Sequence, residues 1–358
     1  MKITDIRVTH VSLNYKGEVR LRRKSHDTAH GCFIHVETDE GLTGIGYAHA
    51  SGPVVIGETP ESIEAIVRSV YRAELLEEDP ANIVFLLEKL DKVARYNTRA
   101  RAAVDFALHD LTAKRFAVPL YSLLGGKHRS EIPVMRLLAI GSPESVAQEA
   151  LKVIQDGYRY LKIKVGTDPE TDVSRIKAVR EAVGNAVTIV ADANQGYDVK
   201  GAISVVNKMA QYGLAIIEQP VLSSDFKGLA TIRRNVEVRV EADESARSLY
   251  DVMRLIDLEA VDFVSIKPPE LGGLKVSQKV AALCEAANVG CLIGTTLGSQ
   301  YVDAVGAHFA AATGNMTFGC ELGEYTRLRD DPVSGLQDKD GCVTVPEGLG
   351  VGITLNLS

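Results

Sequence analysis

Acidic and basic residues end a series of short apolar runs in this sequence. Asp192 ends "VTIVAD", Glu218 follows "LAII", Asp243 ends "VRVEAD" and Lys267 ends "VDFVSIK". Neighbouring members of this set are about 25 residues apart, the length of one strand and one helix with their connections. Three carboxylates brought together repel one another, and a hard divalent cation with oxygen ligands relieves that repulsion. The pattern therefore predicts Mg²⁺ on Asp192, Glu218 and Asp243, because no His or Cys accompanies them.

Two further lysines, Lys162 and Lys164, alternate with apolar residues in "YLKIKV". Side chains alternate along a strand, so both lysines point to the same side. Together with Lys267 they would place amines on two faces of a substrate, as acid and base, with pKa values lowered by burial and by the cation. A metal that chelates a substrate carboxylate would stabilise the enediolate formed when the α-proton leaves. Asn194 would support this site by a hydrogen bond.

Each of these residues also has a structural interpretation when it is taken singly. Asp192 suits a helix N-cap, Glu218 an ion pair between layers, and Lys267 a lysine whose apolar stem is covered while its ammonium is solvated. Lys162 and Lys164 would lie on the solvent face if their strand were at an edge. The recurrence of three acids and a lysine at intervals of about 25 residues favours a common site; these residues are Asp192, Glu218, Asp243 and Lys267.

The elements that must position these residues are eight apolar runs separated by longer amphipathic stretches, typical of parallel strands with crossover helices. The runs are 132–140, 160–165, 187–192, 214–220, 238–243, 261–267, 289–294 and 316–322. Near-equal units favour a closed barrel over an open doubly wound sheet, and the C-terminal strand ends of a barrel meet at one mouth.

The remainder of the chain predicts an α+β unit at the N-terminus. It contains a hairpin over 33–48 and helical patterns at about 60–76, 82–94 and 98–116, and a second hairpin signal lies in the tail. We expect a capping domain over residues 1–128, a barrel over 129–325, and a segment over 326–358 that returns to the capping domain.

Composition excludes several classes of protein. The 358 residues carry a formal net charge of −7, which offers no general attraction to nucleic acid or to an anionic membrane. Five scattered cysteines without a C-x-x-C pair argue against a disulfide framework or a thiolate zinc site. With no apolar leader or membrane span in view, we expect a cytoplasmic protein with a small-molecule carboxylate substrate.

Several motifs, taken in order, resemble the enolase superfamily, in the muconate lactonizing (muconate cycloisomerase) branch of the mandelate racemase/muconate lactonizing enzyme family. They are "SLLGG", "LKIKVG", "ADANQGY", "IIEQP", "EADES", "VSIKPPELGG", "IGTTLGS" and "CELGEY". The resemblance implies a modified TIM barrel, (β/α)7β, beneath an α+β capping domain completed by the C-terminal tail. It also implies Mg²⁺, with Mn²⁺ as a substitute, acid/base lysines at Lys164 and Lys267 with Lys162 beside them, a strand-eight glutamate at Glu321, and a homo-oligomer.

The substrate is narrowed by departures from related patterns. The His–Asp dyad of the mandelate racemase branch is absent from the expected strand ends. Dipeptide epimerases carry Asp-x-Asp where this chain has Glu321-Leu322-Gly323-Glu324, which disfavours a dipeptide. His49 replaces the glutamate that muconate-type relatives carry after G-x-G, which argues against a simple muconate substrate.

Substrate contacts are expected from two loops. The mobile specificity loop, at about 14–30, contains Arg22, Arg23 and His26, which would bind an acidic substrate, although such a basic run is also typical of a solvated loop. Thr295, in "IGTTLG", lies at the end of the seventh strand.

We predict a Mg²⁺-dependent isomerase, either a cycloisomerase or a racemase/epimerase, that abstracts the α-proton of a carboxylate substrate. The alternative is a lyase that dehydrates a hydroxy acid after the same first step. A non-catalytic barrel is the last hypothesis, because it predicts the loss of a site residue and none is missing.

Overall fold

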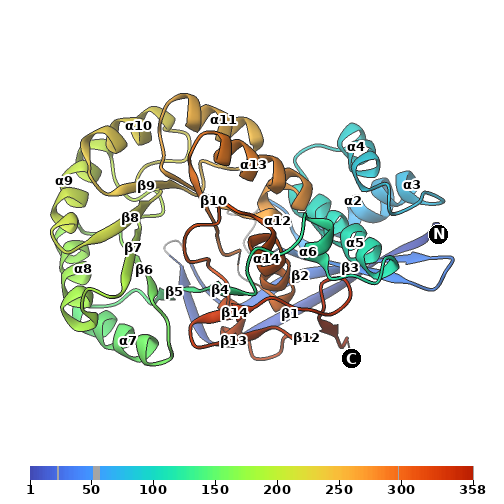
Figure 1. The fold of residues 1–358 in the computed structure, drawn as a ribbon, viewed down its shortest axis with the longest axis horizontal. Coiled ribbons are helices and arrows are strands. Elements are labelled where there is room, and N and C mark those ends of the chain that lie inside the picture. The colour runs from blue at the N-terminus through green and yellow to red at the C-terminus, as the bar shows by residue number, and fades with distance from the viewer. Residues whose placement is uncertain (22–23, 51–56, 297, 358) are drawn as a thin grey trace.

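The computed structural model describes residues 1–21, 24–50, 57–296 and 298–357, with only the backbone described for 18–21 and 24–27. An antiparallel N-terminal unit lies beside a curved parallel sheet whose helices form an outer arc (Figure 1). The described helices all lack the combination of length and apolar character needed to span a bilayer.

The N-terminal unit is a three-stranded antiparallel sheet covered by helices. Its strands are β1 (Ile3–Leu21), β2 (Lys24–Thr38) and β3 (Thr43–His49), in the order β1-β2-β3. Its helices are α2 (Pro60–Ile66), the π-helical η1 (Val67–Tyr71), α3 (Arg72–Leu75), α4 (Ile83–Val93), α5 (Thr98–Arg115) and α6 (Leu120–Leu123). The predicted hairpin and the three predicted helical segments are therefore confirmed.

Helix α5 packs on β3 at very short range because two glycines lie beneath it. A Cβ at Gly46 would lie 1.8 Å from the carbonyl oxygen of Ala103, and a Cβ at Gly44 would lie 2.2 Å from that of Ala107. Only glycine permits such an approach of helix to strand. Helix α5 is buried along most of its length.

The parallel sheet has seven strands in the order β11-β10-β9-β8-β7-β6-β5. They are β5 (Met135–Leu138), β6 (Tyr160–Lys164), β7 (Thr188–Asp192), β8 (Leu214–Glu218), β9 (Arg239–Ala242), β10 (Phe263–Ile266) and β11 (Gly290–Ile293). The helices are α7 (Pro143–Gln155), α8 (Pro169–Val183), α9 (Val199–Ala210), α10 (Phe226–Asn235), α11 (Leu249–Asp257), α12 (Pro268–Leu271), α13 (Leu274–Ala286) and α14 (Gln300–Ala312). This is the predicted barrel-type α/β architecture.

The prediction of a regular eighth strand over 316–322 was wrong. It forms only isolated bridges, yet it joins both edges of the sheet: the amide of Glu321 donates to the carbonyl of Ile293, and the amide of Met135 donates to that of Cys320. Glu321 is thereby fixed on the barrel wall.

The first predicted run, 132–140, also differs from the structure. Its start is β4 (Glu131–Pro133), which pairs with the tail strand β14 (Cys342–Thr344), and only β5 belongs to the barrel. Pro133 lacks an N–H and cannot continue a central ladder, which accounts for the division.

The tail forms the hairpin predicted there. It comprises β12 (Val333–Ser334), β13 (Gln337–Lys339), β14 and β15 (Thr354–Leu355), with a short 3₁₀ helix, η2 (Glu324–Arg327), before them. It also contacts the N-terminal unit, because the amide of Val351 donates to Asp110 and the amide of Arg329 donates to the carbonyl of Asn14.

The expected specificity loop, at about 14–30, is largely strand in the described residues. β1 and β2 continue through it as an antiparallel ribbon, pairing Asn14 with Thr28 and Leu21 with Lys24. A register shift lies between Asn14 and Val19. The mobility of this segment stays a prediction.

His308, buried on α14, makes stability depend on pH. Its Nδ1 accepts from the amide of Tyr121 and its Nε2 donates to the carbonyl of Val351, so the ring is neutral. Burial lowers its pKa to about 4, only partly offset by the bond to Val351. The folded state therefore rejects a proton that the unfolded chain accepts below about pH 6.5, and stability falls as pH drops towards 4.

We predict that His308→Gln removes this contribution, which is at most on the order of 3 kcal/mol between pH 6.5 and 4. Urea unfolding across that range measures it. The exposed His128→Gln variant is the control and should keep the wild-type pH dependence. An unchanged slope in His308→Gln would contradict the prediction.

Candidate active site

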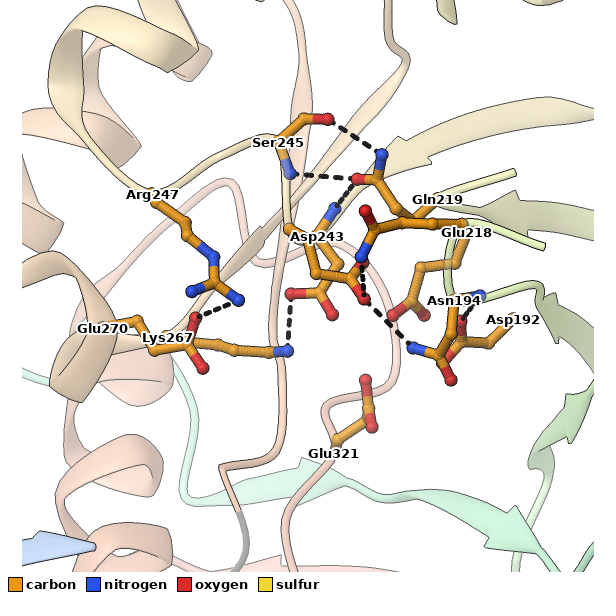
Figure 2. Close-up of polar contacts among 12 residues, drawn as sticks. Asp192, Asn194, Glu218, Gln219, Asp243, Ser245, Arg247, Lys267, Glu270 and Glu321 are labelled. Atoms are coloured by element: carbon orange, nitrogen blue, oxygen red, sulfur yellow. Dashed lines mark hydrogen bonds and ion pairs between the residues drawn. The ribbon is translucent and has the colours of Figure 1, made fainter. Parts of the chain in front are cut away.

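Three of the predicted residues occupy one row of the parallel sheet. Lys164 on β6 is in register with Asp192 on β7, which is in register with Glu218 on β8. Residues in register share a face of the sheet. Asp243 and Lys267 directly follow β9 and β10, so all five lie at the C-terminal ends of their strands. Figure 2 shows the carboxylates of Asp192, Glu218, Asp243 and Glu321 around one central region.

Lys162 lies within this group of carboxylates and is 2% exposed. Its Nζ donates to Glu218 Oε1 at 2.8 Å and to Glu321 Oε1 at 2.7 Å, and lies 3.1 Å from Asp192 Oδ2. Glu218 Oε2 is 2.6 Å from the same nitrogen but lies outside hydrogen-bonding geometry. Carboxylates from β7, β8 and the closing segment therefore face one point.

Lys164 and Lys267 contact the two ends of the carboxylate row. Lys164 Nζ donates to Asp192 Oδ2 at 2.5 Å and to Asn194 Oδ1 at 2.7 Å. Lys267 Nζ lies 2.5 Å from Asp243 Oδ1. In Figure 2, Lys267 and Asp192 lie on opposite sides of the group. Amines from β6 and β10 thus flank the same space.

The electrostatics of the lysines differ from the expectation. Burial by itself lowers the pKa of Lys162 and of Lys267, but the surrounding carboxylates outweigh it and raise both pKa values. Without a cation, burial therefore does not lower these two pKa values below their usual range, and the lowering expected with a bound cation stays a prediction. Each ammonium is stabilised by the acids it contacts.

The carboxylates respond in opposite directions. Burial raises the pKa of Asp192, but the ammonium groups of Lys162 and Lys164 and the amide of Asn194 lower it below its usual value. Burial and neighbouring negative charge raise the pKa of Glu218 and of Glu241. Both oxygens of Glu241, which is 0% exposed, lack a hydrogen-bond partner in the described residues. The group has more buried acid than its lysines neutralise.

The backbone beside the site is held in an unusual conformation. Asn194, Gln195 and Gln219 have positive φ angles of 38°, 67° and 37°. Such angles are rare outside glycine and gather at functional sites. They lie in the turns that leave the site after β7 and β8.

Gln219 supports the site through several hydrogen bonds that the sequence did not indicate. Its Oε1 accepts from the amides of Asp243 at 3.1 Å and Ser245 at 3.0 Å, while its Nε2 donates to Ser245 Oγ and to the carbonyl of Val221 (Figure 2). It therefore fixes the backbone that presents Asp243. Its place after Glu218 in "IIEQP" was the only available signal.

Other contacts were also missed. Glu241 precedes Asp243 by two residues, and strand alternation alone indicated that both face the barrel interior. Glu244 accepts from Asn194 and Gln195, and Glu270 pairs with Arg99 of α5. No sequence pattern indicated the last pair, because its members are 171 residues apart.

The structure describes only some of the predicted substrate-contact residues. Thr295 is half-buried in the segment after β11, and His49 is buried at the end of β3. A Cβ at Gly298 would lie 3.0 Å from His49 Nδ1, so these two segments touch. Arg22, Arg23 and the side chain of His26 lie outside the described residues.

The donor chemistry suits a hard cation, although the lysines contact the acids directly. In the described part of the chain, no three acidic, His or Cys side chains are arranged to hold a metal ion as they stand. Oxygen donors nevertheless converge, since Lys162 contacts Asp192 and Glu218 together and Glu218 Oε2 has no hydrogen bond. Buried carboxylates in excess of their lysines fit a divalent ion with oxygen ligands.

Comparison with known proteins agrees with this fold. The description "Mandelate racemase / muconate lactonizing enzyme, N-terminal domain" matches residues 3–125, and "Enolase C-terminal domain-like" matches residues 145–358. The chain is 35% identical to the L-Ala-D/L-Glu epimerase of Clostridium acetobutylicum, over 98% of this chain and 99% of that protein. It is 31% identical to muconate cycloisomerase 1 of Rhodococcus opacus, over 90% and 88%.

A solved structure matches over its whole length. The dipeptide epimerase of Enterococcus faecalis V583, complexed with Mg and L-Leu-L-Tyr, superposes with a TM-score of 0.94 at 31% identity, covering 99% of this chain and 100% of that one. The chain belongs to the mandelate racemase/muconate lactonizing enzyme family of the enolase superfamily. That family includes epimerases, racemases and cycloisomerases, which confirms the resemblance drawn from the motifs.

We predict that Gln219→Leu lowers the free energy of unfolding by roughly 3 kcal/mol, because two buried amides and a carbonyl lose the hydrogen bonds that Gln219 makes with them. Urea denaturation measures the change. The exposed Gln211→Leu is the matched control and should change stability by less than about 0.5 kcal/mol. Equal effects of the two substitutions would show that the Gln219 hydrogen bonds contribute little.

Proposed function

We propose that this protein is an isomerase that inverts the α-carbon of a carboxylate substrate by two-base proton transfer. The observation that carries the proposal is the placement of Lys164 and Lys267, which contact Asp192 and Asp243 at opposite ends of one carboxylate row. Two amines on either side of a shared space suit removal of a proton from one face and delivery to the other.

In one direction, neutral Lys164 takes the α-proton, and the ammonium it becomes is stabilised by Asp192 and Asn194. The ammonium of Lys267 then gives its proton to the opposite face of the carbon and is left as an amine. The reverse direction exchanges the two roles. Lys162, held among three carboxylates, keeps a fixed positive charge beside the reacting centre.

We further propose that Asp192, Glu218 and Asp243 hold Mg²⁺, for which Mn²⁺ can substitute. The bound ion would supply a positive charge that stabilises the negative charge developing on the substrate carboxylate. The excess of buried acid and the converging oxygens of Asp192 and Glu218 support this assignment. The relative solved with Mg and a dipeptide supports it as well.

The reaction class is supported more strongly than the substrate. An epimerase and a cycloisomerase both match over most of the chain. The match to an L-Ala-D/L-Glu epimerase makes dipeptides the first candidates for test. Glu321, bound by Lys162, stands where an Asp-x-Asp pair was expected for such substrates, so their exclusion stays a prediction.

We predict α-proton exchange in D₂O with Mg²⁺ for at least one member of a panel of Ala-Glu and other dipeptides, N-acyl amino acids, hydroxy acids and muconates. Mass spectrometry detects deuterium and polarimetry detects inversion. Lys267→Ala should abolish exchange of one enantiomer, and Lys164→Ala that of the other, because each lysine serves one face.

The outcomes of this experiment separate the hypotheses. Exchange with inversion supports a racemase or epimerase, and loss of water from a hydroxy acid would instead identify the dehydratase. Equal loss of both enantiomers in each single variant would contradict the two-base mechanism. Exchange that persists in both variants would remove these lysines from the reaction.

We predict that Mg²⁺ raises the melting temperature of the wild-type protein relative to a chelator-treated sample at matched ionic strength. Binding to the folded state alone stabilises it by about 2.7 kcal/mol at a metal concentration one hundred times Kd. Glu218→Gln should show a much smaller increase, because it removes a charged ligand. The same increase in both proteins would contradict the proposed site.

A further inference from the structure

Lys267 is joined rigidly to the short helix that follows it. Its carbonyl oxygen accepts hydrogen bonds from the amides of Glu270 at 2.9 Å and Leu271 at 3.0 Å, so α12 begins from the Lys267 peptide. Pro268 restricts the backbone of the residue before it to extended conformations. A displacement of α12 would therefore move the backbone of Lys267.

Helix α5 of the N-terminal unit holds α12 through charged side chains. Arg99 Nη2 lies 2.9 Å from Glu270 Oε1, and Arg101 Nη1 donates to the carbonyl of Gly272 at 2.5 Å. The side chains of Arg99 and Glu270 are only 3% and 14% exposed. Arg247, at 3.8 Å from Glu270, forms a looser pair with the same carboxylate (Figure 2).

The turn after α12 is pressed against α5 as well. Gly273 has φ of +124°, and a Cβ there would lie 2.2 Å from Asp105 Oδ2. The same Asp105 oxygen accepts from the amide of Lys275 at 3.2 Å. Three α5 side chains, those of Arg99, Arg101 and Asp105, thus contact the segment that leaves Lys267, and little room remains for it to shift.

Stability alone does not account for Arg99. Its Nη1 is buried and has no hydrogen-bond partner among the described residues. A buried guanidinium with an unsatisfied donor carries a desolvation cost, and apolar packing would fill such a position at no such cost. An arginine at this place is better explained by what its bond to Glu270 does.

The opposite lysine is supported differently. Lys164 is held by Asp192 and Asn194, both from the β7 end of the barrel, and its described contacts include none with α5. Among the described residues, α5 therefore contacts the segment that carries Lys267 and makes no contact with Lys164. A substitution of an α5 side chain should therefore change the rate of proton transfer by Lys267 more than the rate of proton transfer by Lys164.

We propose that Arg99, acting through Glu270 and α12, is a positioning residue for Lys267 and controls proton transfer on one face of the substrate only. The inference rests on the proposed two-base function. It assigns to α5 a role in the reaction, although α5 does not belong to the barrel.

The experiment compares exchange of the two enantiomers in D₂O, each measured separately with the substrate pair that exchanges fastest in the panel above. Arg99→Met and Glu270→Gln are tested beside wild type, with Lys267→Ala as the reference for the face in question. We expect both variants to slow exchange of the enantiomer that Lys267→Ala abolishes by roughly ten-fold or more, through kcat, because small misplacement of a reacting group is costly. Exchange of the other enantiomer should change by less than about two-fold.

Arg115→Met is the matched control, since it removes a different ion pair of α5, that with Asp79, and should leave both rates unchanged. Arg99→Lys keeps the charge but not the planar fork, and should fall between Arg99→Met and wild type. It also keeps the test possible if Arg99→Met fails to fold. Glu270→Gln provides a second route to the same result.

An equal fall for both enantiomers in Arg99→Met and Glu270→Gln would overturn the inference, since it would indicate general damage. Unchanged rates in both variants would overturn it too. Either result leaves the two-base function standing if Lys164→Ala and Lys267→Ala are selective for opposite enantiomers. Absence of that selectivity, or of wild-type exchange, would overturn the proposed function and this inference with it.

Discussion

An excess of buried negative charge is the constraint on which the rest of this structure depends. In the described residues, five buried carboxylates converge on the mouth of the barrel, where three lysines contact the group. The carboxylates are those of Asp192, Glu218, Glu241, Asp243 and Glu321. Buried charge is tolerated only where it is paired. Lys162 therefore bridges several acids at once, while Glu241 keeps two oxygens without hydrogen bonds in the described residues. A divalent ion would balance the net negative charge of these five acids and three lysines. The same ion would therefore both stabilise the mouth of the barrel and take part in its chemistry.

The parallel sheet and the N-terminal unit each hold some of these charged residues in place. Register across β6, β7 and β8 aligns a lysine with two acids, so the charges are arranged by backbone hydrogen bonds. Helix α5 is fixed on β3 through glycines and then holds the segment after Lys267 through Arg99. Both lysines contact acids of the barrel, but only the segment that follows Lys267 is also held by α5 among the described contacts.

Much of the site was predictable because it depends on two local rules. Side chains alternate along a strand, and the C-terminal ends of parallel strands meet at one mouth, so Lys162, Lys164, Asp192 and Glu218 converge as expected. The same rules failed where regular pairing ended. Pro133 divides the first run, and the segment bearing Glu321 closes the sheet with isolated bridges in place of a strand.

The sequence by itself determined the family, through its motifs, and the barrel-type architecture with its spacing of acids and lysines, through apolar periodicity and strand ends. Only the tertiary structure decided how the site is held. Gln219 adopts a positive φ and accepts the amides of Asp243 and Ser245, and Arg99 meets Glu270 across 171 residues of chain. Periodicity reports which face a residue occupies, whereas such contacts depend on where distant segments pack in three dimensions.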